Sequence, residues 1–163
     1  MIGETESVSH SAEETIEIGR ELARRLKPPV LVLLSGELGS GKTTLSKGII
    51  SGLGAAREED VTSPTFTLVH VFHNHSTGAG CTCSPPQIKV YHVDLYRIEQ
   101  SADIESLGLE DALSEPAVVL IEWPERFSLS TDWPRVIVRL EHLEGDSRRI
   151  AISGLVSETA PGR

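Results

Sequence analysis

The chain has 163 residues, which suits one compact domain with a complete hydrophobic core. Its formal net charge of -9 argues against stand-alone binding to DNA or RNA, because an acidic surface repels a polyphosphate. The sequence shows no secretory leader, no apolar run long enough to span a membrane, and too few cysteines for a disulfide framework. We therefore expect a cytoplasmic globular protein with no membrane partner.

The first predicted helix begins after a polar N-terminal segment. Residues 1–10 are polar, and we expect them to be flexible. Ser11 and Glu14 form a capping-box pattern, in which Ser11 caps the helix and Glu14 reaches back toward the cap. Apolar residues then recur at helical spacing, and the helix should end before Pro28, because proline disfavours helical conformation at the residue before it.

A buried strand, a glycine-rich turn and a second helix follow in close succession. Residues 30–34 form a continuous apolar run, as expected for a strand that is buried on both faces. The turn over residues 36–41 leads into a helix that starts at Lys42 and has apolar residues on one side. Gly54 suits the position just after this helix, where a left-handed conformation is common.

A hairpin with a long connection is predicted next. Residues 61–72 are rich in β-branched and aromatic residues, with an interruption at Ser63 and Pro64. Residues 88–95 are predicted as the strand that returns beside them. Residues 73–87 collect Asn, Gly, Ser, Cys and Pro, so we expect a surface-loop insertion there.

The C-terminal third is predicted to add a second buried strand and a terminal hairpin. A weak helical pattern over residues 103–113 precedes an apolar run at 117–121 that resembles the first buried strand. Residues 136–143 and 149–152 alternate as expected for a hairpin. We expect the tail, residues 154–163, to be disordered.

The glycine-rich turn carries a phosphate-binding motif. Residues 36–43 read G-E-L-G-S-G-K-T and satisfy the pattern G-x-x-x-x-G-K-[ST]. Glycines allow successive backbone N–H groups to point at an anion, and the helix that follows directs its dipole at the same place. Lys42 would reach the β- and γ-phosphates of a nucleoside triphosphate, and the Thr43 hydroxyl would ligate Mg²⁺. A plain glycine-rich turn with a surface lysine is the weaker interpretation.

Together these elements predict an α/β fold. We expect one three-layer P-loop NTPase-like domain over residues 11–153, with a mainly parallel central sheet and antiparallel hairpins at its edges.

Such a site also needs a carboxylate near Mg²⁺. Glu122 follows the apolar run at 117–121 and would hold an Mg²⁺-bound water or polarise the attacking water. Asp94, at the end of another predicted strand, would orient water or sense the γ-phosphate, and Thr65 would add a second hydroxyl in the manner of a switch segment. The structural alternatives are a solvated glutamate, a turn-forming aspartate and a β-branched strand residue.

Four segments together resemble the bacterial TsaE (YjeE) family, the ATPase component of tRNA threonylcarbamoyladenosine (t6A) biosynthesis. They are G-E-L-G-S-G-K-T-T at 36–44, S-P-T-F-T-L at 63–68, H-V-D-L-Y-R at 92–97 and I-E-W-P-E at 121–125. They occur in the family's order and at nearly its spacing. One such segment is modest evidence, whereas four in order are specific.

The resemblance implies an ATPase that uses ATP and Mg²⁺, with Lys42, Asp94 and Glu122 as catalytic residues and Mg²⁺ shared by Thr43 and Glu122. The implied first switch consists of Ser63, Pro64 and Thr65. Arg97 would contact a phosphate or a partner. The nucleotide-binding residues expected from the motif and the resemblance are Gly36, Glu37, Leu38, Gly39, Ser40, Gly41, Lys42, Thr43, Thr44, Thr15 and Trp123.

The family's partners are the TsaB and TsaD proteins, and TsaD carries the transferase chemistry on tRNAs that read codons beginning with A. The resemblance implies that this chain meets tRNA only indirectly, through the complex, and that its ATP hydrolysis resets that complex between turnovers. We expect slow hydrolysis by the isolated chain and stimulation by the partners, because missing catalytic groups can be supplied in trans.

The long hairpin connection departs from the family pattern and gathers possible zinc ligands. Imidazole and thiolate groups bind zinc, but the spacing here matches no standard zinc finger. The residues concerned are His70, His73, His75, Cys81 and Cys83.

Three other functions are weighed against an ATPase. A small GTPase usually carries an Asn-Lys-x-Asp element, and the only asparagine, Asn74, is followed by histidine. A small-molecule kinase usually has an arginine-rich lid, whereas the arginines here are scattered. A nucleotide-dependent binding switch without useful turnover is compatible with every motif above.

Overall fold

The computed structural model describes residues 4–64, 68–73, 87–99, 107–126 and 131–154. In this part of the chain a seven-stranded sheet has the order β1-β7-β6-β2-β5-β4-β3. The strands are β1 (Thr5–Ser9), β2 (Val30–Ser35), β3 (Val69–His73), β4 (Lys89–Asp94), β5 (Val118–Glu122), β6 (Arg135–His142) and β7 (Arg148–Ser153). The helices are α1 (Ala12–Ala23), α2 (Lys42–Gly52) and α4 (Leu109–Ala112), with 3₁₀ turns η1 (Glu58–Asp60) and η2 (Pro124–Arg126).

The centre of the sheet is parallel and its edges are antiparallel, as the sequence predicted. β2 pairs in parallel with both β5 and β6, and β5 pairs in parallel with β4. β3 is antiparallel to β4, and β7 is antiparallel to both β6 and β1. Every residue of β5 is buried, which agrees with its unbroken apolar sequence.

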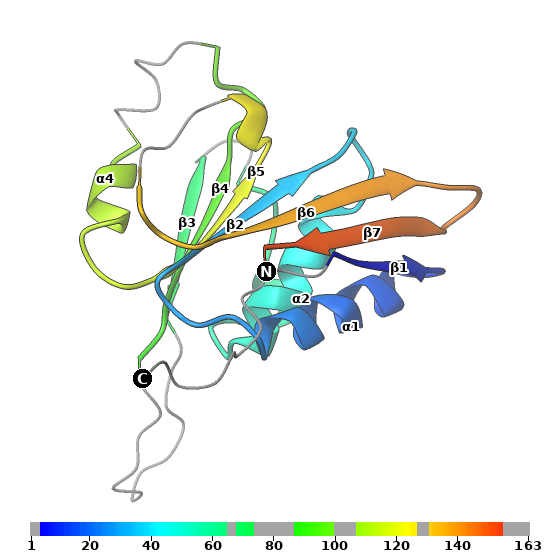
Figure 1. Ribbon diagram of the computed structural model, residues 1–163, viewed down its shortest axis with the longest axis horizontal. Helices are drawn as coiled ribbons and strands as arrows, with labels where there is room; N and C mark the ends of the chain where they lie inside the picture. Colours follow the sequence, from blue (N-terminus) through cyan, green and yellow to red (C-terminus); the bar gives the residue numbers. More distant parts are fainter. Residues whose placement is uncertain (1–3, 65–67, 74–86, 100–106, 127–130, 155–163) are drawn as a thin grey trace, which may run out of the picture.

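Helices cover the two faces of the sheet unequally. Helices α1 and α2 lie side by side on one face, and the short α4 lies on the other (Figure 1). The core is therefore divided into two clusters, one between α1, α2 and the sheet and one beneath α4. This arrangement confirms the predicted three layers. Among the described residues, no helix has the length and apolar composition needed to cross a membrane.

The cap of α1 differs in one detail from the predicted capping box. The Ser11 hydroxyl accepts a hydrogen bond from the Glu14 backbone N–H at 3.1 Å, as expected. The Glu14 carboxylate reaches one residue further back and accepts from the backbone N–H of His10 at 2.7 Å. Both bonds satisfy backbone groups near the start of α1.

The prediction that residues 1–10 are flexible is wrong for Thr5–Ser9, which forms β1. Thr5–Ser9 forms an edge strand whose residues pair antiparallel with β7. Its first four residues are exposed, so it lacks the apolar alternation by which strands are recognised in a sequence. Backbone pairing with the free edge of β7, rather than side-chain burial, accounts for this strand.

The chain before β3 also differs from prediction, since residues 61–64 form no strand. The Pro64 carbonyl accepts a hydrogen bond from the Leu68 N–H at 2.6 Å, and Leu68 is left-handed, with φ of 65°. The surface-loop insertion predicted for 73–87, much of the weak helix predicted for 103–113 and the predicted disordered tail fall largely outside the described residues.

The contact between α1 and α2 has room only for glycine at two facing positions. A Cβ atom at Gly48 would lie 2.1 Å from the Ile16 carbonyl oxygen, and one at Gly19 would lie 2.5 Å from the Leu45 carbonyl oxygen. Both obstacles are backbone atoms, which cannot rotate away as a side chain can. Because α2 begins at the phosphate-binding motif, this close contact also fixes the position of that motif.

We expect Gly48→Ala to lower the free energy of unfolding by about 1–3 kcal/mol, the usual consequence of overpacking. The gain in helix propensity, at most about 1 kcal/mol, acts in the opposite direction and is the smaller effect. Urea denaturation would measure the change, with Lys47→Ala on the same helix as a control that stays within about 0.5 kcal/mol. A stability for Gly48→Ala equal to that of wild type would contradict so close an approach of the two helices.

Candidate functional site

The phosphate-binding motif forms the turn between β2 and α2. Gly36 has φ of 154°, and a Cβ atom there would lie 2.5 Å from the Leu140 carbonyl oxygen. Gly41 caps α2 with φ of 102°, and a Cβ atom there would lie 2.9 Å from the Arg148 side chain. Both positions therefore need glycine for their backbone conformation, and at Gly36 a backbone atom also leaves no room for a side chain.

A cavity of about 400 Å³ lies against this turn, at the carboxyl ends of the central parallel strands. That volume falls within the range of about 300–1,000 Å³ that is usual for ligand pockets. In open α/β sheets this edge is the usual place for a ligand. The lining residues are Leu38, Gly39, Gly41, Lys42, Thr43, Thr44, Ser63, Asp94, Tyr96, Glu122, Trp123 and Arg148.

Lys42 is the first residue of α2 and directs its ammonium group along the turn. Its Nζ donates hydrogen bonds to the carbonyl oxygens of Gly36 at 2.6 Å and Glu37 at 2.8 Å, and it lies 3.4 Å from the Ser40 hydroxyl. The same atom stands 4.1 Å from the centre of the Trp123 ring, a cation–π contact. The lysine side chain is thus held by the backbone of the motif on one side and by an aromatic face on the other.

Burial lowers the pKa of Lys42 below its ordinary value of 10.5. The carboxylates of Glu122, Glu125 and Asp94 act in the opposite direction: they raise the pKa by stabilising the charged ammonium. Desolvation is the larger effect.

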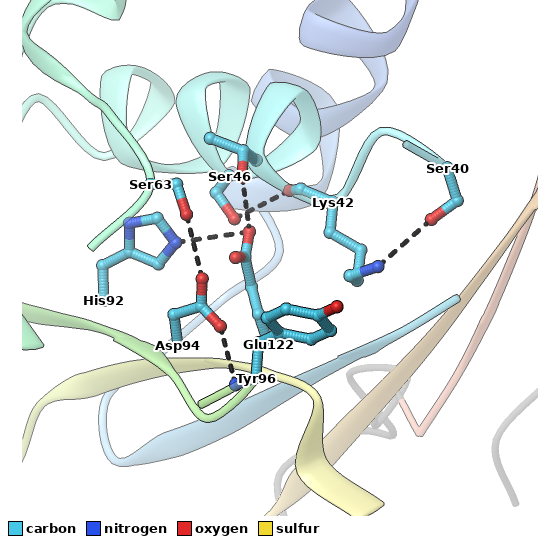
Figure 2. A network of polar contacts seen from close by, with 9 residues as sticks. Ser40, Lys42, Ser46, Ser63, His92, Asp94, Tyr96 and Glu122 are labelled. Atoms are coloured by element: carbon cyan, nitrogen blue, oxygen red, sulfur yellow. Dashed lines mark hydrogen bonds and ion pairs between the residues drawn. The ribbon is translucent and has the colours of Figure 1, made fainter. Parts of the chain in front are cut away.

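Glu122 ends β5 and meets the start of α2. Its side chain is only 2% exposed, and its Oε1 accepts a hydrogen bond from the Thr43 hydroxyl at 3.0 Å. The imidazole of His92 points at the same carboxylate (Figure 2). A hydroxyl and a carboxylate side by side are oxygen ligands of the kind that Mg²⁺ takes in proteins, so these residues fit the ion that the sequence implies.

Asp94 ends β4 and uses both of its carboxylate oxygens. One accepts from the Ser63 hydroxyl at 2.9 Å and the other from the Tyr96 backbone N–H at 2.9 Å (Figure 2). The second bond is the turn-forming interaction that was the structural alternative for this residue. Asp94 therefore shapes the turn after β4 and lines the cavity as well.

Trp123 has a backbone conformation that is uncommon for a large residue. Its φ is 61°, and its N–H donates to the Leu34 carbonyl oxygen at 3.2 Å. Its ring packs on Tyr96, with ring centres 4.9 Å apart, besides covering Lys42. Backbone strain of this kind persists where the surroundings fix it, often at functional sites.

Some predicted site residues lie elsewhere. Thr15 is fully buried in α1, where its hydroxyl meets Ser9 at 2.7 Å and the Ser11 carbonyl oxygen at 3.1 Å, and it does not line the cavity. Arg97 is exposed and also absent from the lining. Thr65 falls outside the described residues. The residues Gly36, Glu37 and Ser40 belong to the turn without forming the cavity wall, and Pro64 lies buried beside Ser63.

The possible zinc ligands do not assemble in the described part of the chain. His70 and His73 lie on β3, three positions apart, and so point to opposite faces of the sheet. No group of three or more histidine, cysteine, aspartate or glutamate side chains able to hold a metal ion occurs among the described residues. His75, Cys81 and Cys83 lie outside them.

Two lining residues were not predicted from the sequence. Arg148 begins β7, donates to the Gly39 carbonyl oxygen at 3.2 Å and packs beside Gly41. Tyr96 forms the wall next to Trp123. Tyr96 could have been predicted from the sequence, because it lies in the H-V-D-L-Y-R segment. Arg148 is 109 residues from its partner Gly39, and no spacing rule connects them.

Comparisons with known proteins identify the family. Residues 9–150 match the family model of the threonylcarbamoyl adenosine biosynthesis protein TsaE. The chain belongs to the TsaE family. It is 40% identical over 144 residues to the tRNA threonylcarbamoyladenosine biosynthesis protein TsaE of Streptomyces coelicolor, covering 85% of this chain and 89% of that protein. The corresponding Treponema pallidum protein is 34% identical over 146 residues, covering 90% of this chain and 98% of that protein.

The fold comparison agrees with this assignment. The crystal structure of Bacillus subtilis YdiB superimposes with a TM-score of 0.65 at 25% sequence identity, covering 96% of this chain and 88% of that one. Each of the four segments that resemble TsaE contributes to the same cavity, through Lys42, Ser63, Asp94 and Glu122 among others. Segments far apart in a TsaE sequence thus form one site in this structure.

We expect the Nζ of Lys42 to titrate below 10.5 in an NMR titration, with Lys42→Ala identifying its signal. A lowered pKa means that, between the folded and the ordinary value, the folded chain binds fewer protons at Lys42 than the unfolded chain does. The contribution of Lys42 to the free energy of unfolding therefore rises with pH in that window. A midpoint at or above 10.5 would show that the three carboxylates outweigh burial.

Proposed function

We propose that this protein is the Mg²⁺-dependent, ATP-hydrolysing component of tRNA threonylcarbamoyladenosine biosynthesis. It acts with TsaB and TsaD in the cytoplasm and reaches tRNA only through that complex. The observation that carries the proposal is the convergence of the phosphate-binding turn, the Thr43–Glu122 pair and Asp94 on one cavity. Family membership supplies the pathway.

The residues around the cavity have distinct roles in binding ATP. The backbone N–H groups of the turn and the N-terminus of α2 would hold the phosphates, and Lys42 would exchange its carbonyl partners for phosphate oxygens. Thr43 and Glu122 would hold Mg²⁺, which neutralises phosphate charge when bound. Arg148, beside Gly39 and Gly41, adds positive charge at the same place. Trp123 and Tyr96 shield one side from water.

Slow hydrolysis by the isolated chain is supported by the geometry of Asp94. Both of its carboxylate oxygens already accept hydrogen bonds, one of them from Ser63 in the switch-like segment. Each oxygen keeps a second lone pair, but the two bonds fix the direction from which Asp94 can accept a hydrogen bond from an attacking water. A partner that moves the Ser63 segment would reorient the Asp94 carboxylate, which gives a physical route to stimulation.

A nucleotide-dependent binding switch without useful turnover is the second candidate. The two hydrogen bonds that fix the Asp94 carboxylate favour it, because they restrict how that carboxylate can meet an attacking water. No feature of the described residues favours a small-molecule kinase, another of the alternatives.

ATP hydrolysis measured with and without the cognate TsaB–TsaD pair tests the proposed function. We expect a slow rate for the isolated chain and stimulation of at least about 10-fold by the pair, since trans-acting groups commonly give larger effects than this. Lys42→Ala serves as the blank, and Lys47→Ala, on the same helix but outside the cavity lining, serves as the matched control. Equal rates with and without the pair would remove the basis for partner-gated turnover, and binding of ATP by Lys42→Ala with wild-type affinity would contradict the phosphate site.

We expect Glu122→Gln to reduce hydrolysis by about 100-fold or more and to reduce ATP affinity less than hydrolysis, because the amide keeps the shape but loses the charge near Mg²⁺. Single-turnover hydrolysis and calorimetric titration would measure the two quantities on the same preparation. Equal losses of hydrolysis and of ATP affinity would instead indicate a structural role for Glu122.

A further inference from the structure

A fully buried histidine stands beside Glu122 and has no role in the function proposed above. His92 lies on β4 with 0% exposure, two residues before Asp94 and on the same face of the strand. Its Nε2 is 3.5 Å from Oε1 of Glu122 (Figure 2). Among the described residues, neither ring nitrogen has a partner that meets hydrogen-bond geometry.

We propose that His92 is a positioning residue for Glu122. Its Nε2–H donates to Oε1 and holds the carboxylate beside the Thr43 hydroxyl, in the orientation that receives Mg²⁺. This inference rests on the proposed function, because it concerns the residue assigned there as a Mg²⁺ ligand.

Glu122 needs more hydrogen-bond donors than Thr43 provides. An ionised carboxylate only accepts hydrogen bonds, and at 2% exposure this one has little access to water. The Thr43 hydroxyl supplies one donor, and it is also the group expected to turn a lone pair toward the metal ion. Among the described residues, His92 is the other side chain whose possible donor lies close to the carboxylate.

The position of His92 otherwise suits an apolar residue. Its neighbour Val90 on the same face of β4 is fully buried, as are Val118 and Leu120 on β5. A polar ring left unpaired in such surroundings is unfavourable, so a buried imidazole there needs a chemical reason. Donation to Glu122 provides one for Nε2.

The distance between His92 and Glu122 calls for a small movement. Hydrogen bonds between N–H and oxygen usually span about 2.7–3.2 Å, so 3.5 Å is a few tenths of an ångström too long. Rotation of the Glu122 side chain closes that gap, and hydrogen bonds at catalytic sites commonly shorten when the ligand binds. Residues that orient a metal ligand in this way typically change metal affinity by about 10–100-fold when they are removed.

The experiment compares ADP affinity with Mg²⁺ and with EDTA, measured by calorimetry on full-length variants. His92→Leu removes the donor at similar volume, whereas His92→Gln can place an amide N–H near the Nε2 position. His70→Leu is the matched control, because His70 lies opposite His92 on β3 and, within the described ranges, forms no hydrogen bond or ion pair with Glu122. Thermal melting establishes that each variant folds.

Mg²⁺ should raise the affinity of wild type for ADP, and we expect His92→Leu to reduce that increase by about 10-fold or more. Its affinity for ADP in EDTA should stay within about 2-fold of wild type. His92→Gln should recover most of the loss, and His70→Leu should match wild type. An unchanged Mg²⁺ increment in His92→Leu, or a loss in His92→Gln as large as in His92→Leu, would overturn the inference. Failure of wild type itself to bind ADP would count against the proposed function and not against His92 in particular.

NMR of the wild-type imidazole keeps the inference testable even where His92→Leu does not fold. We expect the His92 ring to carry a proton on Nε2 and its signals to shift in Glu122→Gln. A ring protonated at Nδ1 alone, or ring signals that do not shift in Glu122→Gln, would contradict the proposed hydrogen bond.

Discussion

The site depends on the parallel pairing of β2, β5 and β4. In that register Leu34 lies opposite Glu122, and Glu122 lies opposite Asp94, so the ends of the three strands form one row across the sheet. The phosphate-binding turn leaves β2 just beyond this row. A slip of one residue in β5 would turn Glu122 to the other face and away from Thr43. The register of a buried, parallel core therefore decides whether the chemical groups meet.

The same core buries three charged side chains of the site, which is electrostatically unfavourable. Lys42, Asp94 and Glu122 are 6%, 4% and 2% exposed, and burying charge is unfavourable unless it is paired. Local hydrogen bonds partly offset this cost: the ammonium donates to carbonyl oxygens of its own turn, Glu122 accepts from Thr43, and Asp94 accepts from Ser63 and a backbone N–H. These bonds hold the side chains in place, and a ligand or partner must exchange them to change the site.

Much of the architecture could be predicted from the sequence. The continuous apolar runs before Gly36 and before Glu122 predicted β2 and β5, because strands buried on both faces carry no polar alternation. β1 was missed for the opposite reason: its side chains are mostly exposed, and it is held by backbone pairing with β7, which leaves no pattern in the sequence. Residues 61–64, the start of a predicted strand, form no strand, and the Pro64 carbonyl instead accepts a hydrogen bond from the Leu68 N–H.

Short motifs with local spacing predicted the chemical groups of the candidate site: a phosphate-binding turn, a hydroxyl and two acidic strand ends. The folded arrangement of the chain sets which residues line the cavity. It brought Arg148 to Gly39 and the ring of Trp123 over Lys42, and it set His92 against Glu122. It also places Thr15 away from the cavity, where its hydroxyl forms a hydrogen bond with Ser9. These contacts join residues through sheet register and helix packing, which are long-range constraints that no local spacing encodes.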